Sequence, residues 1–330
     1  MTPDFIQLAK AHKRRIVLPE SDDQRILEAA IYCDTKGIAE IILVGDPTIL
    51  KAKLSTLNLS AGNIQIVNPS TSENTQAFAN ALYDLRSKKG LTKEQSEEFV
   101  HRPLYFANLM VHQGLADGCV AGAINSTGDV IRAALQIIGT KTRETRLSSS
   151  FIMITPSLPT PVLFADCAIN IEPDAPQLAD IALQSAKNIK ALLGIEPKVA
   201  MLSFSTNGSA RHENVDKVAA ATAILHSKYP EINAIGEIQF DAAISNEILK
   251  KKWDGADFET PANVFVFPSL EAGNIGCKIT ERIGGATAVG PILQGLDKPI
   301  NDLSRGADVK SIINTIAVTC LQVNDEKSSF

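Results

Sequence analysis

The sequence has few cysteines, and they form no recognisable pattern. Five are present, an odd number, and they are widely spaced without a C-x-x-C pair: Cys33, Cys119, Cys167, Cys277 and Cys320. This spacing argues against a disulfide framework and against a zinc knuckle. Free thiols are typical of a reducing compartment, so we expect a cytoplasmic protein that binds no metal.

The sequence also lacks long apolar runs and a strong charge of either sign. It has no run of about 18 apolar residues, and no basic stretch precedes an apolar one at its start. We therefore expect neither a transmembrane helix nor a signal peptide. The net charge of −5 gives no basic footprint for nucleic acid or for an anionic membrane surface. Any anionic ligand must then be held by local arginines or by backbone N–H groups.

Common nucleotide, hydrolase and metal motifs are absent. There is no G-x-G-x-x-G after a predicted strand, no Walker A sequence, no H-E-x-x-H and no G-x-S-x-G. The histidines do not cluster at the spacing of metal ligands. These absences argue against a dinucleotide-binding protein, a P-loop enzyme, a zinc peptidase and a serine hydrolase with a nucleophile elbow.

The sequence does contain a regular alternation of short β-branched runs and longer helical stretches. Strands are predicted at residues 15–18 and 39–44, with a helix between them at 23–36. The apolar runs 150–155 and 161–165 predict a hairpin. Strand–helix alternation of this kind is typical of an α/β fold in which parallel sheets are covered by helices.

The pattern also predicts two domains. The chain is longer than a single core of about 250–300 residues, and a second strand–helix series begins near Ser148. The closing helix at 309–323 is expected to pack back on the first domain. We assign residues 1–145 plus 303–330 to the first α/β domain and residues 146–302 to the second.

Ligands of open α/β sheets bind at the carboxyl ends of the strands, so the loops at that edge are the first candidates for a site. Residues 204–210 follow the predicted strand 198–203 with small hydroxyl residues and Gly208, just before a helix. Such a loop can offer free backbone N–H groups to a phosphate. A helix N-cap with a tight turn would explain the same residues.

Two further polar segments are candidates. Residues 122–129 follow a predicted strand and open a helix whose first turn holds Arg132. A cation there is unfavourable for the helix dipole, so Arg132 either reaches toward an anion or is a solvated surface residue. Near the C-terminus, Ser304 and Arg305 precede Gly306 in a polar turn. This turn pairs one hydroxyl with one guanidinium, and a capped loop is the alternative explanation.

Several collinear stretches connect the chain to a known family. They are RIVLPE (15–20), PLYF (103–106), ADG (116–118), LFAD (163–166), VAMLSFST (199–206), GEIQFDAA (236–243), NVFVFP (263–268), GNI (273–275) and PINDLSRG (299–306). Over nearly its full length the chain therefore resembles the phosphotransacetylases, in the short stand-alone form of the phosphate acetyl/butyryltransferase family.

The resemblance implies a fold, a reaction and partners. It implies a two-domain fold like that of isocitrate and isopropylmalate dehydrogenases, with the active site in the interdomain cleft, and a homodimer. The family reaction transfers an acetyl group reversibly between acetyl phosphate and coenzyme A, which are substrates, with no permanently bound cofactor. Transfer of propionyl or butyryl groups is an alternative. A second alternative is a catalytically impaired relative that still binds coenzyme A or phosphate.

The resemblance also implies roles for individual residues. A hydroxyl and several guanidinium groups suit this reaction, because they can bind a small dianion and stabilise charge that develops on its oxygens. The implied catalytic residues are Ser304, Arg305, Arg282 and Arg132. The implied substrate-binding residues are Arg86, Ser126, Thr127, Ser205, Thr206, Gly208, Asn274 and Asp302.

One departure from the family concerns the general base. The family usually has an aspartate seven residues after the catalytic serine, as the proposed base for the thiol, and here that position is Ser311. A serine cannot act as that base. Asp308 is the possible replacement, Asp302 is another, and a third possibility is that Arg305 lowers the pKa of the thiol enough to need no base.

Overall fold

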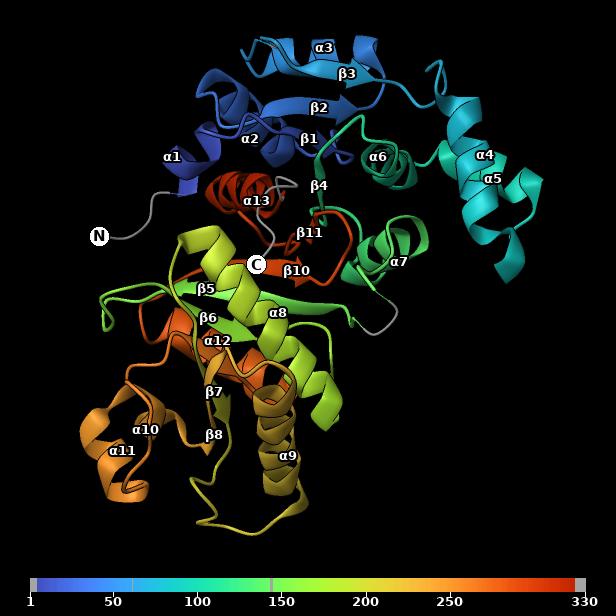
Figure 1. Ribbon diagram of the computed structural model, residues 1–330. Helices are drawn as coiled ribbons and strands as arrows, with labels where there is room; N and C mark the ends of the chain where they lie inside the picture. Colours follow the sequence, from blue (N-terminus) through green and yellow to red (C-terminus); the bar gives the residue numbers. More distant parts are fainter. Residues whose placement is uncertain (1–4, 61, 143–144, 324–330) are drawn as a thin grey trace. The chain divides into compact units, whose positions relative to one another are not determined.

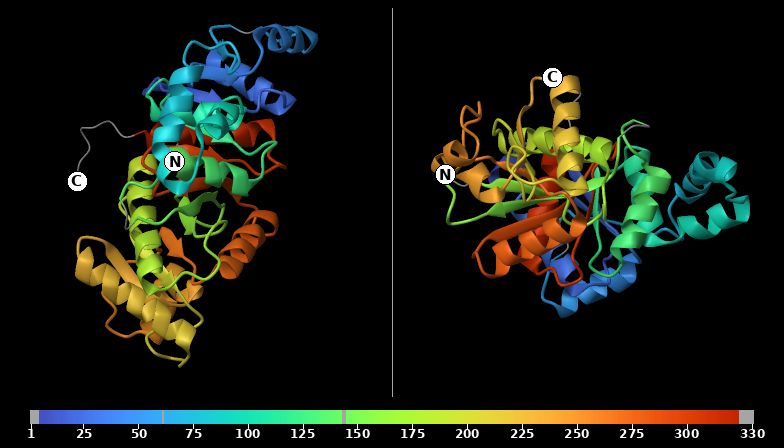
Figure 2. Two further views of the ribbon diagram at one scale, coloured as in Figure 1. Left: turned by 90° about the vertical axis from the view of Figure 1, so that its right-hand side faces the viewer. Right: turned by 90° about the horizontal axis from the view of Figure 1, so that it is seen from below.

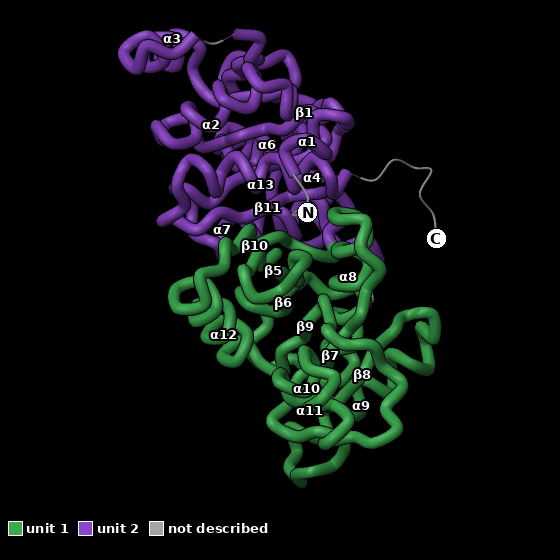
Figure 3. Tube along the Cα trace, turned by 90° about the vertical axis from the view of Figure 1, so that its left-hand side faces the viewer, with its two compact units in different colours: residues 1–3, 143–295 green, residues 4–142, 296–330 purple. Residues whose placement is uncertain are grey.

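The computed structural model describes residues 5–60, 62–142 and 145–323. They form two compact units, of which one holds residues 145–295 and the other holds residues 5–142 with 296–323 (Figure 3). The sequence placed the return to the first domain at residue 303. The structure places it at 296, because Ile300, Asn301 and Asp302 pair with strand residues Cys119, Val120 and Ala121 of that domain.

The sheet of this first domain is entirely parallel. Its strand order is β11-β4-β1-β2-β3, so β1 and β4 are central (Figure 1). The strands are short and mostly buried, as expected for a sheet covered by helices. Their bounds are β1 (Arg15–Leu18), β2 (Glu40–Val44), β3 (Gln65–Val67), β4 (Gly118–Ala121) and β11 (Ile300–Asp302).

Helices cover this sheet. Helix α13 packs on α1, α2 and β4, within the unit that holds residues 5–142. Helix α6 packs on β1 and β4 and also on α7. The bounds are α1 (Phe5–Lys10), α2 (Gln24–Thr35), α3 (Pro47–Thr56), α4 (Thr75–Arg86), the 3-10 helix η1 (Ser87–Lys89), α5 (Lys93–Val100), α6 (Pro103–His112), α7 (Thr127–Ile137) and α13 (Val309–Gln322).

The second domain has a mixed sheet in the order β10-β5-β6-β9-β7-β8. The hairpin predicted from residues 150–165 is confirmed, since β5 and β6 pair antiparallel, and β10 also pairs antiparallel with β5. The remaining pairs are parallel. The strands are β5 (Ser148–Ile154), β6 (Val162–Ala165), β7 (Lys198–Leu202), β8 (Asn233–Ile238), β9 (Val264–Val266) and β10 (Thr287–Gln294).

Alternate residues of the central strands face two separate cores. In β6, Leu163 joins the cluster under helices α8 and α9, whereas Phe164 joins the cluster beside α10, α11 and α12. Figure 2 shows α12 across the sheet from α8 and α9. The helices are α8 (Ala175–Leu193), α9 (Glu213–Lys228), α10 (Phe240–Ile244), α11 (Asn246–Lys252) and α12 (Leu270–Arg282).

The expected α/β class with parallel-rich sheets is therefore confirmed. All five cysteines are buried and free. The described part of the chain contains no helix with the length and hydrophobicity to cross a bilayer.

Candidate functional site

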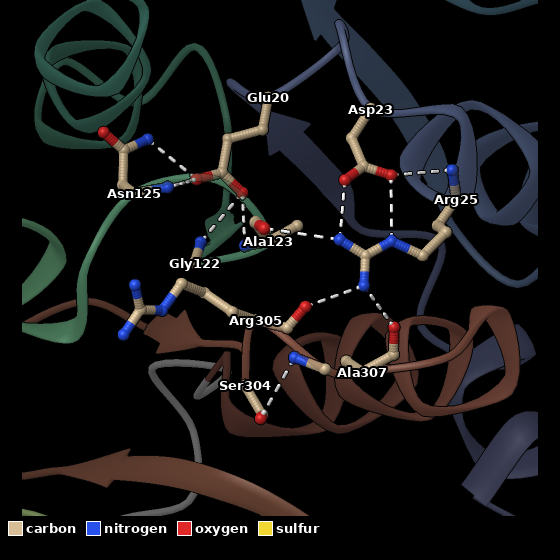
Figure 4. Close-up of polar contacts among 10 residues, drawn as sticks. Glu20, Asp23, Arg25, Gly122, Ala123, Asn125, Ser304, Arg305 and Ala307 are labelled. Atoms are coloured by element: carbon tan, nitrogen blue, oxygen red, sulfur yellow. Dashed lines mark hydrogen bonds and ion pairs between the residues drawn. The ribbon is translucent and has the colours of Figure 1, made fainter.

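The loop after β4 is built around a buried carboxylate, Glu20. One of its oxygens accepts the backbone N–H groups of Gly122 at 2.9 Å and Ala123 at 2.7 Å. The other accepts the backbone and side-chain N–H groups of Asn125, both at 2.7 Å (Figure 4). The side chain is nearly inaccessible to water, so these charge-assisted bonds are strong. The anion that this loop holds is therefore part of the protein.

The loop of residues 204–210 in the second domain, predicted to bind phosphate, likewise holds an internal carboxylate. Glu237 accepts the Ser205 hydroxyl at 3.0 Å and the Gly208 N–H at 2.7 Å. The Thr206 hydroxyl bonds to Gln239. The predicted anion-binding geometry is present, but in this structure Ser205 and Gly208 donate to an internal carboxylate.

The other predicted residues of this domain are separate from that loop. The Asn274 amide donates to the carbonyl of Cys167 at 3.0 Å. Arg282 lies in the last turn of α12, exposed, with its Nε 3.7 Å from the Glu281 carboxylate. Their roles toward a substrate stay predictions.

Three of the predicted residues lie at the start of α7: Ser126 and Thr127 begin the helix, whereas Arg132 is its sixth residue and lies in the second turn, not in the first as predicted. Ser126 caps the helix, accepting the backbone N–H of Asp129 and donating its hydroxyl to the carboxylate of Asp129. Arg132 pairs with Asp129 at 2.6 Å. The anion toward which Arg132 reaches is thus Asp129, in the first turn of the same helix.

Arginines gather around Tyr105, next to this turn. Burial raises the pKa of the Tyr105 phenol, while the charges of Arg102, Arg132 and Arg86 act in the opposite direction. Arg102 and Arg132 line a pocket of about 400 Å³ together with Tyr105 and Asn125. Of the predicted arginines, Arg132 lines this pocket, and Arg86 is near enough for its charge to act on Tyr105. Neither Arg102 nor Tyr105 was predicted from the sequence, although the PLYF stretch (103–106) includes Tyr105 and begins directly after Arg102.

Asp302, at the end of β11, is a buried carboxyl group. Its Oδ2 accepts the Thr127 hydroxyl at 2.7 Å, and its Oδ1 is buried without a hydrogen-bond partner among the described residues. Burial raises the pKa of Asp302 to about 6, and the nearby Glu20 charge adds to this effect. The hydrogen bond joins two predicted substrate-binding residues, one at the start of α7 and one at the end of β11, that are far apart in the sequence.

Ser304 and Arg305 follow in an exposed turn. The turn is closed by the backbone N–H of Ala307, which donates to the Ser304 carbonyl at 2.8 Å, and the Gly306 N–H donates to the Ser304 hydroxyl at 3.3 Å. The described residues provide no ion pair or side-chain hydrogen bond for the Arg305 guanidinium. Both side chains are therefore available to a ligand.

Asp308 and Ser311 form a helix cap. One oxygen of Asp308 accepts the backbone N–H of Ser311 at 2.8 Å and its hydroxyl at 2.6 Å. These bonds lower the pKa of Asp308. An exposed carboxylate with a lowered pKa is a weak base, so the geometry does not favour Asp308 in that role.

Comparisons with known proteins give consistent results. A profile of the family described as phosphate acetyl/butaryl transferase matches residues 2–320. The chain is 45% identical over 320 residues to the phosphate acetyltransferase of Clostridium acetobutylicum, covering 96% of each chain. The EutD phosphotransacetylase of Staphylococcus aureus superimposes with a TM-score of 0.90 at 44% identity, covering 97% of this chain and 98% of that one.

A more distant structure shows a likeness of fold alone. It is a candidate 4-hydroxythreonine-4-phosphate dehydrogenase from Salmonella typhimurium, with a TM-score of 0.55 at 12% identity, covering 94% of this chain and 99% of that one. The expectation of a dehydrogenase-like fold is thereby confirmed. Among the described residues, no group of histidines, cysteines and acidic residues has the arrangement of a metal site.

Proposed function

The chain belongs to the phosphate acetyl/butaryl transferase family, and from this premise we propose that it is a phosphate acetyltransferase. The reaction is acetyl-CoA plus phosphate giving coenzyme A plus acetyl phosphate, and it is reversible. The observation that carries the proposal is the identity of 45% to a phosphate acetyltransferase over 96% of both chains. The exposed hydroxyl and guanidinium of the Ser304–Arg305 turn suit this chemistry.

We assign the bond changes in the direction that forms acetyl-CoA from acetyl phosphate and coenzyme A. The thiolate of coenzyme A attacks the acetyl carbonyl, so that a carbon–sulfur bond forms and the bond between the acetyl carbon and the phosphate oxygen breaks. The phosphate leaves with the electron pair. Negative charge grows on the carbonyl oxygen and on the departing phosphate, where a hydroxyl from Ser304 and the fork of Arg305 stabilise it.

The arginines near Tyr105 are proposed to hold the phosphate groups of the substrates. Arg132 and Arg86 belong to this cluster, with Arg102 beside them. A guanidinium binds a phosphate through two parallel hydrogen bonds, which fixes orientation as well as position.

We propose Asp302 as the general base, acting through the hydroxyl of Thr127. The thiol proton passes to Thr127, whose own proton passes to Asp302 across the 2.7 Å hydrogen bond. A pKa of about 6 suits a base that works near neutral pH. At that pH the carboxyl group is mostly ionised, and the carboxylate is still basic enough to accept a proton. Asp308 lacks this advantage, since capping lowers its pKa.

The wider setting is proposed from the family. The protein is cytoplasmic, serves acetate metabolism and forms a homodimer. Support for a dimer comes from α12, where Ile275 and Ile279 are exposed along one face and Ile283 is exposed at its end. Contiguous apolar surface of this kind commonly marks a protein interface.

The test is thioester formation from purified protein, coenzyme A and acetyl phosphate, followed by ultraviolet absorbance. Propionyl and butyryl phosphate are assayed in parallel. We expect acetyl phosphate to give the highest kcat/KM. A higher kcat/KM with butyryl phosphate would identify butyryl, and not acetyl, as the acyl group that the enzyme transfers. No turnover with any acyl phosphate, from a folded protein that binds coenzyme A, would overturn the proposal in favour of an impaired relative.

A further inference from the structure

The segment after β1 contains, besides Glu20, a charged residue with long-range contacts, Arg25. Arg25 lies in the first turn of α2, where a cation is unfavourable for the helix dipole. Its guanidinium is paired through two nitrogens with Asp23, the N-cap of the same helix, at 2.6 and 3.0 Å. This bidentate pair fixes the plane of the guanidinium and leaves its other N–H groups directed away from Asp23.

Those N–H groups bind three backbone carbonyls from two distant loops. Nη1 donates to the carbonyl of Arg305 at 2.9 Å and to that of Ala307 at 2.7 Å. Nη2 donates to the carbonyl of Ala123 at 3.3 Å. Figure 4 shows the guanidinium between Asp23 and these carbonyls. One side chain therefore joins the exposed turn of Ser304 to the loop that leads into α7.

Few contacts other than the turn's own hydrogen bonds hold it against the rest of the domain. Apart from the hydrogen bonds that Ala307 and Gly306 donate to Ser304 within the turn, its backbone is anchored by Leu303, whose N–H donates to the Ala121 carbonyl, and by the cap of α13 at Asp308. Between them, Ser304 and Arg305 are exposed. The Arg25 bond to the carbonyl of Arg305 restrains the backbone at the residue whose guanidinium is available to a ligand.

We propose that Arg25 is a positioning residue for catalysis, which fixes the position of the Ser304–Arg305 turn relative to the loop before α7. The proposal rests on the proposed function. Arg25 acts through Arg305 and touches no reacting atom. A displacement of about 1 Å at a catalytic group can reduce the rate about 10²-fold, so loss of the contact should reduce kcat far more than it changes KM for acetyl phosphate.

Arg15 offers a matched control in the same domain. It pairs with Asp117 at 2.7 Å, donates to the carbonyl of Gly114 at 3.0 Å and is likewise partly exposed. It lies at the first residue of β1, whereas Arg25 follows the end of that strand. Replacing either arginine removes a bidentate pair and at least one carbonyl contact, but only Arg25 contacts the turn.

The kinetic experiment compares Arg25→Ala, Arg25→Lys and Arg15→Ala with the wild type. We expect Arg25→Ala to reduce kcat about 10²-fold, with a smaller change in KM. Added guanidinium ion should restore part of the activity of Arg25→Ala and none to Arg15→Ala, which should stay near the wild-type kcat. Equal kcat values in Arg25→Ala and Arg15→Ala would overturn the proposal.

A second readout does not depend on activity. Trypsin cuts after arginine, so the rate of cleavage between Arg305 and Gly306, followed by mass spectrometry, reports how firmly the turn is held. We expect faster cleavage in Arg25→Ala than in Arg15→Ala or the wild type. Equal cleavage rates would show that Arg25 does not hold the Ser304–Arg305 turn, even if the enzyme is active. A wild type without turnover would overturn the proposed function and the catalytic role of Arg25, while faster cleavage in Arg25→Ala would still establish the contact.

Discussion

Ser304 and Arg305 combine exposure with a fixed backbone, and this makes them sensitive test positions. Ser304→Ala removes one hydrogen-bond donor and should reduce kcat about 10²–10³-fold, the usual loss for one donor to a developing oxyanion. Arg305→Lys should recover only part of the activity lost in Arg305→Ala, because an ammonium group lacks the planar fork of the guanidinium.

Steady-state kinetics with acetyl phosphate and coenzyme A measures both effects. Ser55→Ala, at an exposed serine of α3, is the matched control and should leave kcat unchanged. Full activity in both Ser304→Ala and Arg305→Ala would show that the site has been assigned to the wrong turn.

The pH dependence of the rate distinguishes the two candidate bases. Burial raises the pKa of Asp302 to about 6, and a base must be ionised to accept a proton. The rate should therefore rise as the pH increases through about 6 and level off above it. Asp302→Asn should lower the rate and remove this acid limb, and Thr127→Val should do the same by breaking the relay.

Asp308→Asn provides the comparison, because its capping bonds resemble those of the wild-type carboxylate but it carries no charge. We expect its acid limb to match that of the wild type. An unchanged limb in Asp302→Asn would favour a mechanism in which Arg305 alone lowers the pKa of the thiol.

At the scale of elements, the packing of β4 against β11 depends on Gly122. Its φ is +111°, and a Cβ there would lie 2.3 Å from Oδ1 of Asp302 and 2.6 Å from the backbone of Leu303. Gly122→Ala should therefore lower the free energy of unfolding by about 3 kcal/mol or more, through backbone strain and overpacking together. Gly139→Ala also meets a positive φ but has open space around it, so about 1 kcal/mol is expected.

Urea denaturation of both variants measures the difference. A similar loss in Gly122→Ala and Gly139→Ala would mean that the Asp302 loop moves aside at little cost.

The elements also show what the sequence could predict. The spacing of apolar residues predicted most strands, the longer helices and the position of the polar loops at the ends of β4 and β7, but not helices α1, α3, α10 and α11. Strand β11 was missed because it has three residues, of which two are Asn301 and Asp302, and it is held by pairing with β4. Propensity carries no signal for such a strand.

The details of the site depended on contacts that sequence spacing does not encode. Glu20 is 102 residues from Gly122, and Arg25 is 280 residues from Arg305. A loop with free N–H groups and a loop filled by a carboxylate have the same local sequence pattern. The resemblance found the turn of Ser304, but the side chains that hold that turn became visible only in the structure.

At the scale of the whole molecule, the second domain leaves the apolar face of α12 exposed. Ile275, Ile279 and Ile283 recur every four residues, so they lie along one side of the helix. Elsewhere in this domain, alternate strand residues are buried in two well-packed cores. An uncovered stripe of large aliphatic side chains is the surface expected of a subunit that associates with its own copy.

Ile279→Glu should therefore convert the proposed dimer into a monomer, because a carboxylate at the centre of the interface would lose its hydration without gaining a partner. Ile279 is 53% exposed in the single chain, and Ile49 on α3 of the first domain is 56% exposed. Ile49→Glu is the matched control and should remain dimeric. Sedimentation velocity measures the mass of each variant, and circular dichroism establishes that each is folded. A dimeric Ile279→Glu protein would place the interface on another surface, and a monomeric wild type would overturn the dimer itself.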